Sequence, residues 1–205
     1  MRLLVVGAGG HAKVVIDAAR AAGHDVVAAV GSAEGTADIL GIPVVPDATA
    51  VTADGFIIAV GDNRRRAALF SEYVVTGLAA TTVVHPSAVI AASAEIADGT
   101  FVAAGAVVNP SARIGCNVIL NTGCTIDHDC VVADHAHIGP GVNVCGGTSV
   151  GSGTLLGVGS CAMPGVQIGA WSVVGAGAAI VSDLPARMVC TGVPARPTHP
   201  VEDAL

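Results

Sequence analysis

The chain has 205 residues and a net charge of −7, and 52% of its residues are hydrophobic. It holds 27 glycines but only three Phe, one Tyr and one Trp. This composition excludes a disordered chain, and abundant glycine argues against a helical bundle. The sequence has no uninterrupted run of 18 apolar residues, so no membrane span is predicted. The negative charge and the single lysine exclude a nucleic-acid-binding surface, which needs many basic residues.

The first segment has the pattern of a strand, a turn, a helix and a second strand. An apolar strand over residues 3–6 is followed by the glycine-rich turn 7–11, a helical pattern over 12–22 and a strand over 26–30. Glycines at a helix N-terminus let a phosphate approach the backbone amides. As a dinucleotide motif the pattern is incomplete, because Ala12 replaces the third glycine and no acidic residue follows the second strand.

A further buried strand is expected over residues 56–60, followed by Gly61 and a helix from Arg64–Arg66 to about residue 76. The three arginines are interpreted as a solvated helix face or as a phosphate contact. The pattern changes near residue 81. We therefore predict two domains, a Rossmann-like α/β domain over residues 1–80 and a repeat domain over residues 81–205.

The second segment is an uninterrupted six-residue repeat. An aliphatic residue recurs at every sixth position from Val84 to Ile180, which is 17 positions, and only Ala162 among them is not Val, Ile or Leu. Small residues precede these positions and glycines often follow them. The repeat predicts a solenoid in which three hexads close one triangular coil of about 18 residues, with parallel strands on each face. The aliphatic side chains then fill a narrow prism of five to six coils.

The cysteines indicate free thiols. The six cysteines occur without a CxxC pair, and no signal peptide is evident at the N-terminus, so a reducing cytoplasm is expected. No two of them are 18 or 36 residues apart, so disulfides between stacked coils are not predicted. A cysteine zinc site is likewise not predicted.

The 18-residue period sorts the histidines of the prism. Gly146 stacks beside His128, and this bare neighbour is expected to leave open space and a free amide near the imidazole. Asp129 is next in sequence, so a turn must bring it to His128. His137 is half a coil away and must lie on another face. His85 and His135 are expected to be structural, and Asn117 stacks under His135 as a hydrogen-bond partner.

Five segments carry a resemblance to a known family. They are VVGAGGHAKVVIDAA, AVGDNRRR, TVVHPSAVI, NTGCTIDHDC and GVPAR, and they occur in this order over nearly the whole chain. The sequence resembles the bacterial sugar acyltransferases, which include nucleotide-sugar N-acetyltransferases and sialic acid O-acetyltransferases of the hexapeptide-repeat superfamily. The resemblance implies a left-handed parallel β-helix, a homotrimer with active sites between subunits, and acetyl-CoA as co-substrate with no metal.

The resemblance also implies roles for particular residues. His128 is then the catalytic base supported by Asp129, and the Gly146 amide is the oxyanion donor. Acetyl-CoA would touch the three positions His137, Val158 and Ala176, of which the last two are 18 apart and form one track. The α/β domain would bind a nucleotide-sugar through Gly9, Gly10, His11 and Gly61. Where the family carries acidic residues after the second strand, this chain has Gly31 and Ser32.

The leading hypothesis is an acetyl-CoA-dependent N-acetyltransferase that acts on a UDP- or GDP-linked amino sugar. The first alternative is an O-acetyltransferase for a sugar such as sialic acid. A second is a zinc hydratase of the β-helical carbonic anhydrase type, with His135 and His137 as ligands. A third is a binding subunit without catalytic activity.

Overall fold

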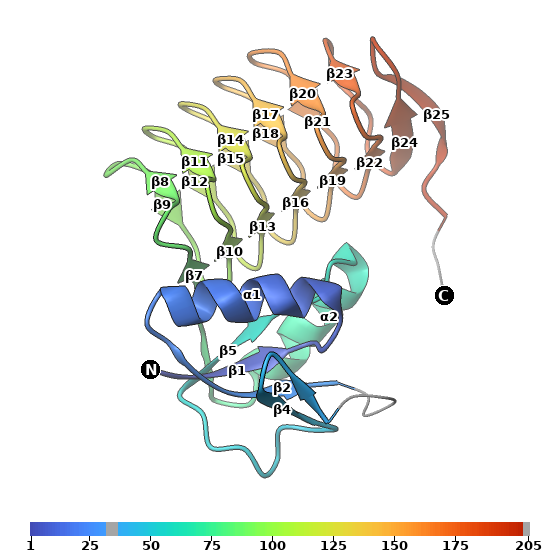
Figure 1. Cartoon of the computed structure of the whole chain (residues 1–205). Helices are drawn as coiled ribbons and strands as arrows, with labels where there is room; N and C mark the ends of the chain where they lie inside the picture. The colour runs from blue at the N-terminus through green and yellow to red at the C-terminus, as the bar shows by residue number, and fades with distance from the viewer. Residues whose placement is uncertain (32–36, 203–205) are drawn as a thin grey trace.

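The computed structural model describes residues 1–31 and 37–202. The chain begins with a six-stranded sheet flanked by two helices, and continues as a three-sided prism (Figure 1). Among the described residues no helix combines the length and the apolar character needed to cross a bilayer.

The N-terminal sheet has the strand order β3-β4-β2-β1-β5-β6 and is parallel apart from the β3–β4 hairpin. Its strands are β1 (Arg2–Val6), β2 (Asp25–Val30), β3 (Asp38–Ile39), β4 (Ile42–Val45), β5 (Gly55–Ile58) and β6 (Ala79–Ala80). The helices are α1 (Gly10–Ala21) and α2 (Asn63–Val74). The expected strand–turn–helix–strand unit is present, but α1 begins two residues earlier than residue 12. The β3–β4 hairpin was not predicted.

The prism has three parallel sheets, which we call the docked, second and third faces. The docked face consists of β7 (Val83–Val84), β10 (Phe101–Val102), β13 (Ile119–Leu120), β16 (His137–Ile138), β19 (Leu155–Leu156), β22 (Val173–Val174), β24 (Met188–Thr191) and the antiparallel β25 (Arg196–Pro200). The second face consists of β8 (Val89–Ile90), β11 (Val107–Val108), β14 (Thr125–Ile126), β17 (Asn143–Val144), β20 (Cys161–Ala162) and β23 (Ala179–Ile180). The third face consists of β9 (Glu95–Ile96), β12 (Arg113–Ile114), β15 (Val131–Val132), β18 (Ser149–Val150) and β21 (Gln167–Ile168).

The strands of the prism follow the sequence repeat. Each strand from β7 to β23 ends on one of the repeated aliphatic positions, and paired residues are 18 apart, as in Phe101↔Ile119. The second residue of each strand points into the bore; Val102, Leu120 and Ile138 are fully buried there. Burial of these side chains in every coil is the main stabilising contribution of the repeat.

The α/β domain packs directly on the docked face. Helix α1 lies between the N-terminal sheet and the first coils (Figure 1). Its buried residues Ala12 and Ile16 share one hydrophobic cluster with Phe101 and Ile119 of the prism. The sequence boundary at residues 80 and 81 falls between β6 and β7, yet the apolar core is continuous across it. The position of the α/β domain relative to the prism is therefore set by packing rather than by a linker.

Candidate active site

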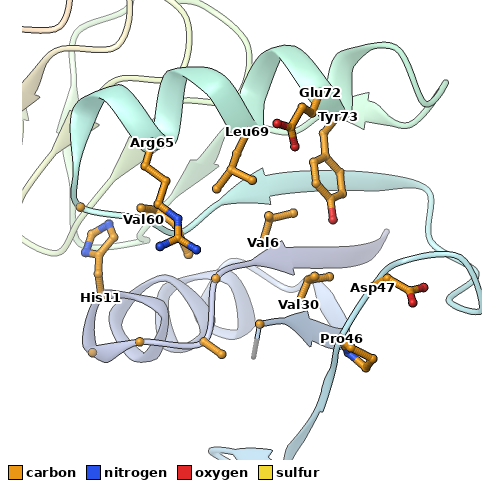
Figure 2. A pocket seen from close by; sticks show the side chains of 17 residues that line it. Val6, His11, Val30, Pro46, Asp47, Val60, Arg65, Leu69, Glu72 and Tyr73 are labelled. Carbon is orange, nitrogen blue, oxygen red and sulfur yellow. The ribbon is translucent and has the colours of Figure 1, made fainter. Parts of the chain in front are cut away.

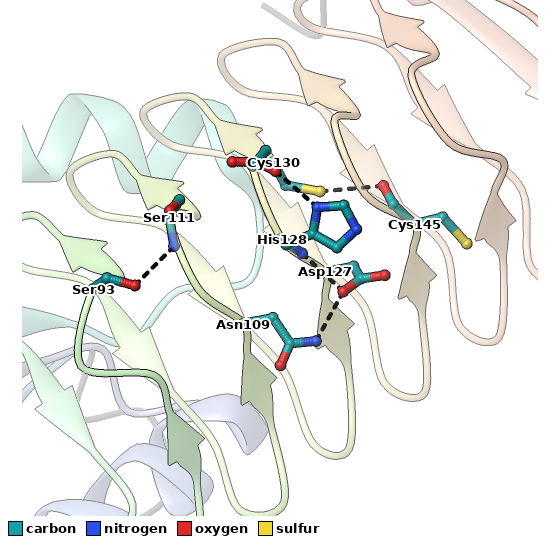
Figure 3. A network of polar contacts seen from close by, with 8 residues as sticks. Ser93, Asn109, Ser111, Asp127, His128, Cys130 and Cys145 are labelled. Atoms are coloured by element: carbon teal, nitrogen blue, oxygen red, sulfur yellow. Dashed lines mark hydrogen bonds and ion pairs between the residues drawn. The ribbon is translucent and has the colours of Figure 1, made fainter.

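His128 lies at a corner of the prism, in the turn that joins β14 on the second face to β15 on the third face. Asp129 follows in the left-handed region, with φ of +59°, a conformation that Asp tolerates better than most residues. This turn places both side chains together, and His128 Nδ1 donates to Asp129 Oδ2 at 2.8 Å (Figure 3). Because a carboxylate only accepts, Nδ1 carries the proton and Nε2 keeps its lone pair.

A second carboxylate lies on the other side of His128. Asp127 Oδ1 accepts from the His128 amide at 2.8 Å and from Asn109 Nδ2 at 3.0 Å (Figure 3). The hydrogen bond to Asp129 and then the charge of Asp127 raise the pKa of the exposed imidazole. The bond from the His128 amide in turn lowers the pKa of Asp127. The corner thus holds an imidazole of raised pKa between the carboxyl groups of Asp127 and Asp129.

Gly146 stacks beside His128 as expected, but the space next to it is not open. A Cβ added at Gly146 would lie 2.6 Å from both Cε1 and Nε2 of His128. The imidazole therefore fills the volume that the missing side chain leaves, and the expectation of open space was wrong. The Gly146 amide also contributes to lowering the pKa of Asp127, so that N–H faces a carboxylate already. A side chain at position 146 would displace the ring from this place.

His137 lies on the docked face and not at the corner of His128. Its Nε2 lies 3.0 Å from Asn121 Nδ2, and its Nδ1 lies 3.4 Å from the Gly61 carbonyl of the α/β domain. Its ring centroid is 6.3 Å from that of His11. Burial first, and then the nearby Arg66 cation and His11, lower the pKa of His137 to about 4. His137 is therefore a neutral group at the junction of the two domains.

The three consecutive arginines have three different environments. Arg64 stacks on Trp171, with 5.4 Å between the guanidinium carbon and the ring centroid. Arg65 is exposed and lines the cavity described below. Arg66 is 1% exposed, and it donates to the carbonyls of His135 at 2.6 Å and Asn117 at 3.1 Å. The expectation of a solvated face fails for Arg66, because the prism covers this side of α2.

A large cavity opens above the carboxyl ends of β1, β2 and β5. Its volume is about 720 Å³, and Figure 2 shows it between the N-terminus of α1 and helix α2. Gly9, Gly10, His11, Gly31 and Gly61 all line it, which brings together every described residue that was predicted to bind the substrate. Ser32 lies outside the described residues.

Glycine at position 31 has a packing reason. A Cβ added to Gly31 would meet the Ala8 side chain at 2.5 Å. The glycine-rich turn can therefore lie directly against the end of β2. Arg65, one of the arginines interpreted as a solvated face or a phosphate contact, lines the cavity. The sequence pattern did not indicate the other cavity residues contributed by α2 and by the segment after β4, because only the folded chain brings them to the first turn. They are Leu69, Glu72, Tyr73, Pro46 and Asp47.

Val158 and Ala176 lie in the turns between the docked and second faces. Both are exposed, Val158 to 55%, and Gly177 N donates to the Val158 carbonyl at 2.9 Å in the stacked coils. They form the apolar track that their spacing predicted. His137 lies one coil before Leu155 and is paired with it, so this track begins near the domain junction.

The remaining predictions concern structural residues. His135 Nδ1 lies 2.9 Å from Asn117 Nδ2, which confirms the predicted stacking partner. His135 and His137 are each bonded to a different asparagine, and no cluster of three metal-ligating side chains occurs in the described part of the chain. All six cysteines are free. The pair Asn109 and Asp127 was missed, although its 18-residue spacing predicts contact.

Comparisons with known proteins agree with this architecture. Residues 2–73 match the family described as PglD N-terminal domain. A mutant of perosamine N-acetyltransferase from Caulobacter crescentus, solved with CoA and GDP-perosamine, is 40% identical, covers 97% of each chain and gives a TM-score of 0.93. The acetyltransferase domain of PglB from Neisseria gonorrhoeae, solved with acetyl coenzyme A, is 33% identical over 96% of this chain and 98% of that chain, with a TM-score of 0.92.

WeeI from Acinetobacter baumannii shares the fold, with 24% identity, a TM-score of 0.89 and coverage of 97% of this chain and 100% of that chain. No match was found among curated protein sequences. The chain belongs to the family of sugar acetyltransferases with a hexapeptide β-helix. It is an acyltransferase of that family.

Proposed function

We propose that this protein is an acetyl-CoA-dependent N-acetyltransferase that acts on an amino sugar linked to a nucleotide. The observation that carries the proposal is the His128 corner. Asp129 fixes the Nδ1–H tautomer at 2.8 Å and leaves Nε2 as an exposed proton acceptor. Two relatives above 30% identity that match nearly the whole chain, solved with CoA or acetyl-CoA, support the same reaction class.

The chemistry assigned to this corner is direct acyl transfer. The sugar nitrogen attacks as the neutral amine, so an ammonium first releases one proton to solvent. His128 Nε2 then takes a proton from the attacking amine, a C–N bond forms at the thioester carbonyl, and the C–S bond breaks. The proton held by His128 then goes to the leaving thiolate, so the imidazole is regenerated. The proposed oxyanion donor is the amide of Gly146, the residue that stacks beside the imidazole. A developing oxyanion would compete with Asp127 for this N–H.

The co-substrate is assigned to the apolar track on the prism. The exposed side chains of Val158 and Ala176 suit the pantetheine arm of acetyl-CoA, and His137 lies near the start of this track. When bound, acetyl-CoA supplies the activated acyl group. The six free thiols and this co-substrate are consistent with an enzyme of the reducing cytoplasm.

The nucleotide part is assigned to the cavity of the α/β domain. The amides of Gly9, Gly10 and His11 at the start of α1 and the Arg65 guanidinium surround a position for a diphosphate. His11 lies at the side of the cavity next to the prism, with its ring 5.6 Å from that of Phe101. The amino sugar is therefore expected to project toward the docked face.

A complete site is proposed to need two subunits. The cavity is lined by residues of the α/β domain, which packs on the docked face, whereas His128 is at the opposite corner, between the second and third faces. Packing of prisms side by side in a homotrimer would bring His128 of one subunit to the cavity of the next. The observation that supports this arrangement is the separation of the two halves of the site within one chain.

The test is a release assay for the CoA thiol with the full chain and acetyl-CoA. Acceptors are nucleotide-linked amino sugars, their hydroxyl analogues and free sialic acid. Turnover of the amino compound alone supports N-acetylation, whereas turnover of sialic acid supports the O-acetyl alternative. His128→Asn should lower kcat by about 10²–10⁴-fold, and His199→Asn, an exposed histidine away from the corner, should not.

The shared site is tested by mixing two inactive variants, His128→Asn and Arg65→Glu. Mixed assemblies contain sites with an intact His128 from one subunit and an intact cavity from another, so activity should return after the subunits are exchanged. Retained activity of His128→Asn would overturn the assignment of the base. A monomer in solution that remains active would overturn the shared site.

A further inference from the structure

The cavity of the α/β domain has two different ends, and this inference rests on the proposed function. Figure 2 shows His11 and Arg65 toward one end, and Pro46, Asp47, Glu72 and Tyr73 at the other. At the first end, the His11 ring lies 5.6 Å from Phe101 and 6.3 Å from His137, both in the prism. The second end lies on the far side of the cavity from the prism.

This polarity fixes the direction of a nucleotide-sugar. The acetylated amine must approach the prism, so the sugar occupies the His11 end. The diphosphate belongs in the middle, where the first amides of α1 meet the Arg65 guanidinium. The nucleobase is then left with the end formed by Pro46, Asp47, Glu72 and Tyr73.

The base end carries two carboxylates and one phenol. Asp47 Oδ1 accepts from the Thr49 amide at 2.9 Å and from the Thr49 hydroxyl, and these bonds lower the pKa of Asp47. The Tyr73 ring packs on Phe56 with 5.5 Å between centroids, which fixes its position. Burial, and then Glu72 and Asp47, raise the pKa of Tyr73, so its hydroxyl stays protonated.

These groups suit guanine better than uracil. Carboxylates only accept hydrogen bonds, and guanine presents two neighbouring donors, N1–H and the N2 amino group, beside the O6 acceptor. A carboxylate can accept from both donors while the Tyr73 hydroxyl donates to O6. Uracil offers a single N3–H between two carbonyl oxygens, which a carboxylate repels. We infer that the cavity selects a guanine nucleotide through Asp47, Glu72 and Tyr73, so that the acceptor is a GDP-linked amino sugar.

A structure of a relative fits this inference. The Caulobacter crescentus enzyme that is 40% identical to this chain was solved with GDP-perosamine. The family carries acidic residues after the second strand, where this chain has Gly31. Asp47 and Glu72 supply carboxylates to the same cavity from other segments. The departure from the family pattern is thus a relocation of negative charge and not its loss.

The experiment is isothermal titration of the full-length protein with GDP and with UDP. GDP should bind at least about 10-fold more tightly than UDP, the discrimination expected of one bidentate contact to a base. The double variant Asp47→Asn, Glu72→Gln should weaken GDP binding about 10-fold and leave UDP binding unchanged or stronger. Asp17→Asn, on the exposed side of α1, removes a carboxylate of the same domain and should change neither affinity. Unchanged thermal unfolding of each variant shows that the fold is intact.

The outcomes separate this inference from the proposed function. Equal binding of the two nucleotides, tighter binding of UDP, or equal losses for both nucleotides in the double variant would overturn guanine selection. If UDP-linked amino sugars are then acetylated, the proposed function stands and only the base assignment falls. If neither nucleotide binds and no nucleotide-sugar is acetylated, the proposed function itself fails. Preferred acetylation of a GDP-linked amino sugar supports both.

Discussion

Two groups of histidines in this molecule have opposite electrostatic environments. At the prism corner, His128 is exposed and lies between the carboxylates of Asp127 and Asp129, which raise its pKa. At the domain junction, His11 and His137 are largely buried near Arg66, and burial followed by the Arg66 cation lowers the pKa of each to about 4. The same side chain is thus kept basic in one region and neutral in the other.

The difference separates the proposed catalytic group from the groups that hold the two domains together. A general base needs an accessible lone pair, and the proposed base His128 is exposed and has a raised pKa. A junction between two domains needs groups that stay uncharged, since an unpaired buried charge is costly. Arg66 tolerates burial only because backbone carbonyls surround it.

The largest effect is expected from removing the charge at the junction. Arg66→Met should lower the free energy of unfolding by about 3–5 kcal/mol, since several buried carbonyls lose their donor. Urea denaturation measures the change. Arg65→Met removes the same group one residue earlier, at an exposed position, and should cost about 0.5 kcal/mol or less. Equal losses in both variants would show that the Arg66 contacts do not stabilise the junction.

Acid should destabilise the junction next. His11 and His137 bind protons in the unfolded chain below pH 6.5 but in the folded chain only near pH 4. Stability from these groups is complete above pH 6.5 and is lost as pH falls toward 4, by on the order of 2–4 kcal/mol in total. Denaturation at pH 7 and pH 4.5 measures this loss.

Two variants then test which region is responsible. His137→Asn removes one titrating group and should flatten the decline of stability with acid. His128 has a raised pKa, so its contribution has the opposite sign and is lost as pH rises. His128→Asn should therefore not flatten the decline. The junction explanation fails if His137→Asn leaves the slope as it was.

A smaller effect is expected at the corner, where Asp129→Asn removes the main cause of the raised pKa of His128. The base must be neutral, so activity falls as pH drops through its pKa. In the variant the acid limb of kcat/KM should move to lower pH, while kcat falls on the order of 10-fold. Full pH–rate profiles check this shift, which a purely structural role of Asp129 would not produce.

The smallest effect is expected from Asp127→Asn. The amide keeps an oxygen acceptor for the His128 N–H at 2.8 Å but removes the charge that is the second cause of the raised pKa. The acid limb should move in the same direction as with Asp129→Asn, by a smaller step. A larger step than with Asp129→Asn would reverse the ranking of the two carboxylates.

The prism was predictable from the sequence because its determinants are local and repeat. Each aliphatic position from Val84 to Ile180 meets the same environment one coil further on, so spacing alone gave the strands and the contact of His135 with Asn117. The turn at Asp129 was predicted because Asp129 is next to His128 in sequence and can reach its side chain only through a turn. These are short-range relations of fixed offset.

The junction and the base end of the cavity were not predictable in this way. Arg64, Arg65 and Arg66 are adjacent in sequence, and only the docking of α2 on the prism decides that the third is buried. Asp47 and Tyr73 come from segments with no common period, and the tertiary fold brings them to one cavity. The expectation of open space beside Gly146 was wrong, because the 18-residue spacing identifies His128 as the stacked neighbour but does not determine its rotamer.

The Arg66 contacts have a consequence for substrate length. Arg66 joins α2, which forms one wall of the nucleotide cavity, to the coils that carry Asn117 and His135. The separation between the base end and the docked face is thereby set when the chain folds, before any ligand binds. Under the proposed function, this fixed separation suits a nucleoside diphosphate sugar, and we expect a monophosphate-linked sugar to be too short to bring its amine to the acyl group.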